Sequence, residues 1–119
     1  MMSAVENKRQ FYRLKYPPGA RPSVWFSKQR YCVSEVSEGG IRVILKEPSA
    51  LQIGFAMAGV LSLQNDSDVS IVGDVFRFDG HEMVIKLDKG PSFKHMVDEQ
   101  RYIRSKYPAF YDRLRGKVA

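Results

Sequence analysis

The chain of 119 residues has little cysteine and no long apolar run. Its one cysteine, Cys32, cannot form an internal disulfide, and no cluster of cysteine and histidine suggests a zinc site. The longest apolar stretch, residues 51–63, is shorter than the about 20 residues that a membrane-spanning helix needs. The first ten residues lack the apolar segment of a signal peptide. We therefore expect a cytoplasmic protein with no metal, no cofactor and no membrane span.

Patterns typical of catalytic sites are also scarce. The sequence contains no GxGxxG, no Walker loop and no HExxH. The two histidines, His81 and His95, have no serine or cysteine nucleophile placed beside them by the sequence, so we interpret them as surface residues. We expect that the protein is not an enzyme.

The composition is that of an ordinary globular domain, with 44% hydrophobic and 27% charged residues. The net charge of +6 is distributed unevenly. Bases dominate residues 1–30 and 92–119, whereas acids outnumber bases in residues 31–91. Basic ends favour an anionic partner. The alternative is a solvated surface whose charges bind nothing specific.

Short apolar segments separated by turn residues predict an antiparallel barrel of about six strands. We expect turns at Ser27–Arg30, Ser37–Gly40 and Asp79–Gly80. The expected strands are Ser23–Phe26, Tyr31–Val36, Ile41–Leu45, Gly54–Leu63, Val69–Phe78 and Glu82–Leu87.

The last third of the chain has helical periodicity instead. Ser92 is a suitable N-cap, Asp98 and Glu99 lie towards the start of the helix, and Pro108 ends or breaks it. We expect a stripe of Phe93, Met96 and Ile103 to pack against the barrel. The predicted organisation is a flexible tail (1–8), one domain (9–108) and a helical extension or tail (109–119). Within the domain the barrel covers about 14–90 and the helix about 92–107.

Two short motifs stand near the front of the chain. Arg9 and Arg13 form an RxxxR pair just before the first expected strand. The segment Glu35–Gly40, with the sequence EVSEGG, follows at the far end of the second expected strand. A segment with similar spacing of an acidic residue, serine and glycine, Asp68–Gly73 (DVSIVG), lies inside an expected strand and lacks the Gly-Gly turn, so we reject it on position.

In these motifs, their order and their surroundings the chain resembles the PilZ domain family, bacterial receptors for the second messenger cyclic-di-GMP. The basic and aromatic opening (residues 8–14), the turn and strand at 36–43 and the closing helix at 99–108 are similar to those of the family. The resemblance implies a six-stranded antiparallel PilZ-type β-barrel with a C-terminal α-helix. One position departs from the family pattern, because Glu35 stands where the family has Asp or Asn.

The resemblance also implies a binding site. Its residues would be Lys8, Arg9, Arg13, Glu35, Ser37, Gly39 and Gly40. An arginine fork meets the N7 and O6 acceptors of guanine together, and it also pairs with phosphate in a bidentate manner. Ser37 would make a hydrogen bond, and Gly40 would let the backbone approach closely. Glu35 either accepts guanine N–H groups or holds an arginine in position.

We therefore expect a non-catalytic receptor that orders its N-terminal arginine loop on binding cyclic-di-GMP. It would signal to a separate partner protein of the motility, pilus or biofilm machinery, as the family resemblance implies. A PilZ-like adaptor that no longer binds the nucleotide is the first alternative, and Glu35 is its main support. A barrel that binds single-stranded nucleic acid through its basic ends is a weaker alternative.

Overall fold

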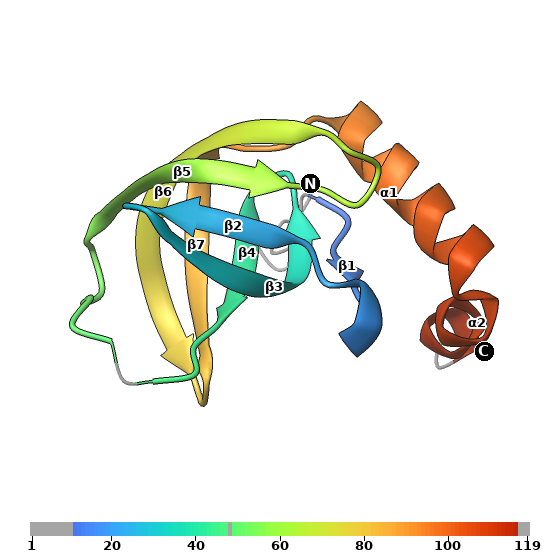
Figure 1. The fold of residues 1–119 in the computed structure, drawn as a ribbon, viewed down its shortest axis with the longest axis horizontal. Helices are drawn as coiled ribbons and strands as arrows, with labels where there is room; N and C mark the ends of the chain where they lie inside the picture. The colour runs from blue at the N-terminus through green and yellow to red at the C-terminus, as the bar shows by residue number, and fades with distance from the viewer. Residues whose placement is uncertain (1–10, 48, 117–119) are drawn as a thin grey trace, which may run out of the picture.

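The computed structural model describes residues 11–47 and 49–116. They form seven strands, with one short 3-10 helix after the first strand and two α-helices after the last (Figure 1). The strands are β1 (Leu14–Lys15), β2 (Ser23–Phe26), β3 (Gln29–Ser37), β4 (Gly40–Ile44), β5 (Ala56–Ser62), β6 (Asp68–Asp79) and β7 (Glu82–Lys89). The helices are a short 3-10 turn (Pro18–Ala20), α1 (Phe93–Lys106) and α2 (Pro108–Gly116).

Six of the strands close into an antiparallel barrel, which confirms the expected fold class. The order β3-β2-β5-β6-β7-β4 returns to β3 through the β3–β4 pairing. The remaining strand, β1, was not expected. It pairs with the second half of β3 (Leu14 with Val36, Lys15 with Glu35), while β2 pairs with the first half of β3. The strand β1 therefore fixes the chain beside Glu35, at the place where β2 has left β3.

Two hairpin turns are tighter than expected. Ser27 and Lys28 both have positive φ (47° and 69°), and Phe26 pairs directly with Gln29. A two-residue turn with positive φ at both positions matches the twist of its strands, so β3 begins at Gln29 rather than at Tyr31. The second turn is Gly80-His81, since Asp79 still pairs with Glu82.

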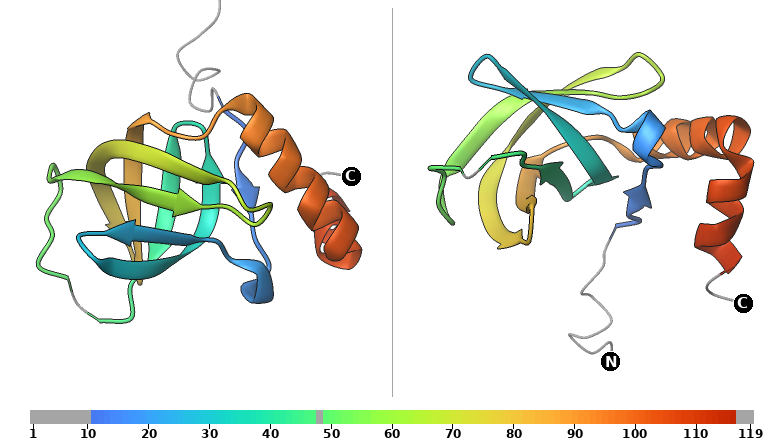
Figure 2. Two further views of the ribbon diagram at one scale, coloured as in Figure 1. Left: turned by 45° about the horizontal axis from the view of Figure 1, so that its top comes forward. Right: turned by 60° about the horizontal axis from the view of Figure 1, so that its bottom comes forward.

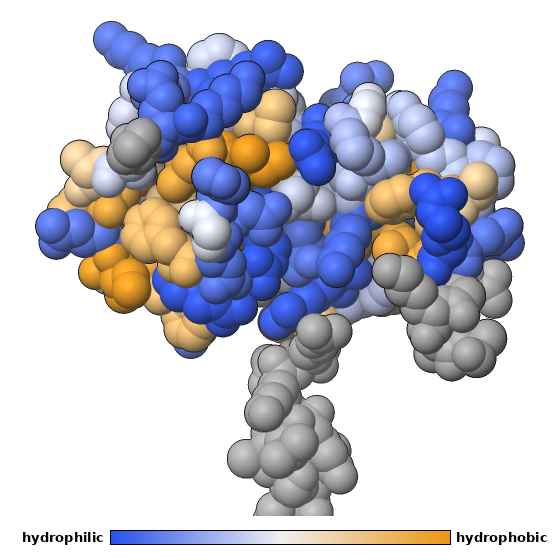
Figure 3. Space-filling model, turned by 90° about the horizontal axis from the view of Figure 1, so that it is seen from below, coloured by the Kyte–Doolittle hydropathy of each residue, from blue (hydrophilic) through white to orange (hydrophobic). Residues whose placement is uncertain are grey.

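Alternating side chains of the barrel strands form the core. Along β6, buried and exposed residues alternate from Asp68 to Phe76. Each barrel strand contributes at least one side chain that is almost completely buried: Val24, Val33, Val43, Leu61, Ile71 and Ile85. Several large apolar side chains stay exposed, and Figure 3 shows apolar groups gathered on one face of the barrel.

The helix α1 begins at the predicted N-cap. The Ser92 hydroxyl accepts from the His95 backbone N–H at 3.2 Å, and His95 Nδ1 accepts from the Ser92 N–H at 3.0 Å. His95 thus completes a capping box. Met96 and Ile103 are buried as expected. Phe93 is 71% exposed, so its predicted packing is wrong, because at about 3.6 residues per turn it lies about 90° from the centre of the buried face formed by Met96, Glu99 and Ile103.

A buried carboxylate joins α1 to the barrel. Glu99 is 0% exposed and accepts from the Tyr16 hydroxyl at 2.7 Å. It also accepts from the backbone N–H groups of Gln64 and Asn65, both at 3.0 Å. Figures 1 and 2 show α1 and α2 on the side opposite the β4–β5 connection. Among the described residues, no helix has the length and apolar character required to cross a bilayer.

Candidate functional site

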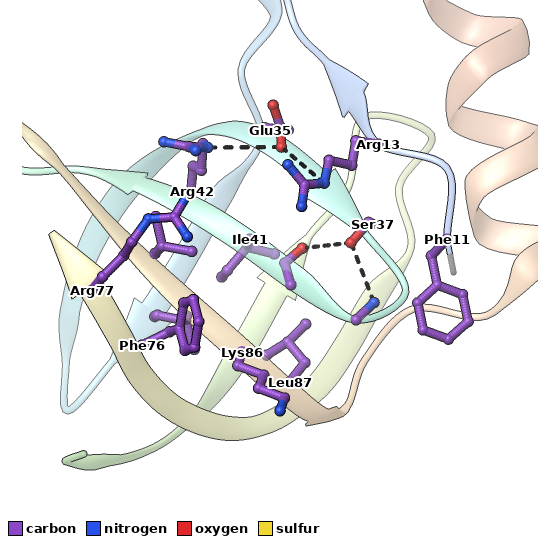
Figure 4. Close-up of a pocket in the computed structure, with 14 residues that line it drawn as sticks. Phe11, Arg13, Glu35, Ser37, Ile41, Arg42, Phe76, Arg77, Lys86 and Leu87 are labelled. Atoms are coloured by element: carbon purple, nitrogen blue, oxygen red, sulfur yellow. Dashed lines mark hydrogen bonds and ion pairs between the residues drawn. The ribbon is translucent and has the colours of Figure 1, made fainter. Parts of the chain in front are cut away.

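A cavity of about 510 Å3 lies beside the turn between β3 and β4 (Figure 4). Its walls come from the segment before β1 and from β3, β4, β6 and β7. The lining residues are Phe11, Arg13, Glu35, Ser37, Gly39, Gly40, Ile41, Arg42, Phe76, Arg77, Val84, Ile85, Lys86 and Leu87. The structure thus brings together the five predicted site residues that it describes, Arg13, Glu35, Ser37, Gly39 and Gly40. Lys8 and Arg9 lie outside the described residues.

Strand register builds one wall of this cavity. Glu35 of β3 pairs with Arg42 of β4, Arg42 pairs with Val84 of β7, and Val84 pairs with Arg77 of β6. Residues directly opposite each other on neighbouring strands present their side chains on the same face of a sheet. The row therefore carries two arginines and one carboxylate along the wall.

The turn between β3 and β4 forms another wall. The Ser37 hydroxyl donates to the Gly40 carbonyl at 3.2 Å and accepts from the Gly39 N–H at 3.3 Å. A Cβ on Gly39 would lie 2.9 Å from the Phe11 ring, and a Cβ on Gly40 would lie 3.1 Å from the Ile85 carbonyl. Neither glycine has positive φ. These positions favour glycine because of close packing, and the serine fixes the turn.

Glu35 lies between two arginines. Its Oε2 atom is 4.0 Å from Arg13 Nε and 3.8 Å from Arg42 Nε (Figure 4). Glu35 is buried, whereas the Arg13 side chain is 38% exposed. This arrangement corresponds to the second of the two expected roles, in which the carboxylate holds an arginine in position. The guanidinium of Arg13 remains open to the cavity.

The sequence reasoning missed Arg42. Its Nη1 is 3.0 Å from Asp79 Oδ2 and donates to Glu82 Oε1 at 3.2 Å. Partial burial acts to lower the pKa of Arg42, but hydrogen bonds to Glu82 and Asp79 outweigh it and raise that pKa. The signal in the sequence was an arginine in the middle of the aliphatic segment Ile41–Leu45.

Phe76, Arg77 and Lys86 were also missed. The Arg77 guanidinium carbon lies 5.5 Å from the centre of the Phe76 ring, and Arg77 Nε donates to both carboxylate oxygens of Asp79. The hydrogen bond from Arg77 is the largest cause that lowers the pKa of Asp79. The described cavity is therefore lined by four basic side chains and one acidic side chain, with two aromatic rings, Phe11 and Phe76, beside them.

The rejected match at Asp68–Gly73 lies within β6 and is paired along its length with β5. None of its residues lines the cavity. A paired strand has no turn whose backbone could approach a ligand, so rejecting the match on position agrees with the structure.

Comparison with known proteins identifies the type of fold. No family model and no curated protein sequence matches the chain. Solved structures do match. The inhibitor of motility MotI/DgrA from Bacillus subtilis aligns over 83% of this chain and 51% of its own, with TM-score 0.63 and 20% identity. The PilZ domain of YcgR from Escherichia coli, with c-di-GMP, aligns over 90% of this chain and 97% of its own, with TM-score 0.59 and 16% identity.

The fold is of the PilZ type. YcgR of Escherichia coli in complex with c-di-GMP also matches, over 94% of this chain and 51% of its own, with TM-score 0.53 and 18% identity. The chain thus spans about half the length of MotI/DgrA and of that YcgR structure. At these identities the similarity establishes the PilZ-type barrel, whereas the identity of a ligand depends on the chemistry of the cavity.

Proposed function

We propose that the protein is a non-catalytic receptor for cyclic-di-GMP and that the nucleotide binds in the cavity beside the β3–β4 turn. One observation carries the proposal. Residues of the two sequence motifs, which are far apart in the chain, line the same cavity of a PilZ-type barrel. A PilZ domain of this fold has been solved with c-di-GMP.

The chemistry of the cavity suits this ligand. Cyclic-di-GMP carries two phosphates and two guanines, and four basic side chains line the cavity. Arg13 can direct its exposed guanidinium at a phosphate or at the N7 and O6 edge of guanine. The Phe76 ring, with Arg77 beside it, offers a face on which a base can stack. Lys8 and Arg9 remain predicted contacts from the N-terminal segment.

Calorimetric titration with cyclic-di-GMP tests the proposal. We expect the wild type to bind, and Arg13→Ala to bind about tenfold to a hundredfold more weakly, since a bidentate arginine contact is worth about 1–3 kcal/mol. Arg9→Ala/Arg13→Ala should lose more. Arg101→Ala, which removes an exposed arginine of α1 that does not line the cavity, is the matched control and should bind like the wild type. Equal affinity of Arg13→Ala and wild type would show that the site is misplaced.

The proposed signal is a change in the N-terminal segment that a separate partner protein recognises. MotI/DgrA is an inhibitor of motility, which supports a partner in the motility machinery, while the pilus or biofilm machinery stays a prediction. Amide hydrogen exchange of residues 8–13 should slow when the nucleotide is added. Unchanged exchange would contradict this mechanism.

A PilZ-like adaptor without a nucleotide is the second candidate, because Glu35 lies against the arginine that would bind the ligand. The same titration separates the two functions. If the wild type releases no heat at high micromolar nucleotide, the adaptor is favoured.

A further inference from the structure

Arg42 is surrounded by three carboxylates. Its Nη1 atom is within 3.2 Å of both Asp79 and Glu82, and its Nε atom is 3.8 Å from Glu35. Glu82 is itself fixed, because its other oxygen accepts from the Ser34 hydroxyl at 2.7 Å. The side chain of Arg42 is only 21% exposed. Although Arg42 lines the cavity, its Nε and Nη1 atoms face protein carboxylates.

Glu35 presents a problem for a site that takes an anion. It is a buried carboxylate at the wall of the cavity, and the same oxygen faces both Arg13 and Arg42. Without Arg42, that oxygen would have Arg13 as its one described cationic partner. A charge left in a partly buried place attracts its remaining partner strongly. Arg13 would then be drawn to Glu35 instead of to the ligand.

We propose that Arg42 is a positioning residue, which touches no part of the nucleotide but shares the charge of Glu35 and so weakens the hold of that carboxylate on Arg13. The inference rests on the proposed function, since the group kept available is the arginine that binds cyclic-di-GMP. The direct pairing of Glu35 and Arg42 across β3 and β4 supplies the geometry. Arg42 thereby compensates for the glutamate at position 35.

A double-mutant cycle tests this role by calorimetry with cyclic-di-GMP. Arg42→Gln should weaken binding about tenfold, because Glu35 is left with Arg13. Glu35→Gln/Arg42→Gln should bind more tightly than Arg42→Gln, because the competing carboxylate is gone. If Arg42→Gln binds like the wild type, the inference is overturned. It is also overturned if the double variant binds no better than Arg42→Gln, because Arg42 then acts on the ligand directly.

Arg30→Gln is the matched control, because Arg30 lies on another barrel strand, β3, and donates to a neutral side chain, Ser23, at 2.9 Å. Its affinity should equal that of the wild type. Thermal unfolding of each variant shows whether a loss of binding is a loss of fold. A rescue by Glu35→Gln in variants of equal stability is an effect that a purely structural role of Arg42 would not produce.

A second measurement needs no ligand. The Nε–H signal of Arg13 can be followed by 15N NMR in the wild type and in Arg42→Gln. The rate at which this proton exchanges with water should fall several-fold in Arg42→Gln. In Glu35→Gln/Arg42→Gln the rate should return to the wild-type value. If the wild type binds no nucleotide, the proposed function fails, and this signal still decides the role of Arg42. An unchanged Arg13 signal would overturn that role.

Discussion

Two buried glutamates of this protein have opposite surroundings. Glu99 accepts three hydrogen bonds of 2.7–3.0 Å from a phenol and two backbone N–H groups. Glu35 has ion pairs of 3.8 and 4.0 Å with two arginines and lies at the wall of a cavity. Neutral donors, two of them on the backbone, hold the first carboxylate. Charged groups on long side chains hold the second.

The difference separates a structural carboxylate from one that we propose takes part in ligand binding. Short bonds from fixed donors satisfy a buried charge but leave nothing to exchange with a ligand. Long ion pairs beside open space can be exchanged, because a phosphate or a guanine can replace the carboxylate as the partner of an arginine. Burial alone therefore does not distinguish the two glutamates, whereas the chemistry of their partners does.

The largest expected effect comes from Glu99. Glu99→Ala leaves the buried Tyr16 hydroxyl and the partly buried N–H groups of Gln64 and Asn65 without their acceptor. We expect the free energy of unfolding to fall by about 3–5 kcal/mol, measured by urea denaturation. Glu47→Ala, at an exposed position, should change it by less than about 0.5 kcal/mol. A loss below 1 kcal/mol in Glu99→Ala would show that the contact contributes little.

The same contact predicts a dependence on alkaline pH. Burial is the largest cause that raises the pKa of Tyr16 far above its ordinary value of 10.0, and the negative charge of Glu99 is the second. A tyrosine that ionises more easily when unfolded stabilises the fold fully below pH 10 and loses that contribution as the pH rises further. The free energy of unfolding should therefore fall by up to about 1.4 kcal/mol per pH unit above pH 10.

Urea midpoints from pH 8 to pH 11 measure this decline. Tyr16→Phe should start from a lower stability, because the hydrogen bond to Glu99 is lost, but should decline less steeply above pH 10. The pKa of Tyr12 is also raised, by partial burial and by Tyr111. Because Tyr12 is present in both proteins, it accounts for part of any decline of stability with pH that remains in Tyr16→Phe. An equally steep decline in Tyr16→Phe would assign the effect to other groups.

Much of the barrel was predictable from the alternation of its strands, and the cavity residues that follow a local motif were predictable too. Ser37 and Gly40 belong to a turn that the local sequence specifies. Arg42 and Arg77 required the register of four strands. A β-bulge between Val75 and Arg77 also interrupts the alternation of β6. A regular alternating pattern therefore does not predict that the successive residues Phe76 and Arg77 both line the cavity.

Glu99 shows a different limit. A charged residue in an amphipathic helix is normally assigned to the solvent face. Glu99 lies three residues after Met96 and four before Ile103, on the buried face of α1. The spacing was available in the sequence, but its partner Tyr16 is 83 positions away, and no local pattern predicts such a contact.

Of the two buried glutamates, Glu35 has the smaller expected effect on stability. Glu35→Gln removes two ion pairs of 3.8–4.0 Å, one of them to a partly exposed arginine. Arg42 keeps Asp79 and Glu82 as partners. We expect the free energy of unfolding to change by less than about 1 kcal/mol in urea denaturation, against about 3–5 kcal/mol for Glu99→Ala. If Glu35→Gln costs as much as Glu99→Ala, Glu35 is also a structural residue, and its carboxylate is not exchangeable with a ligand.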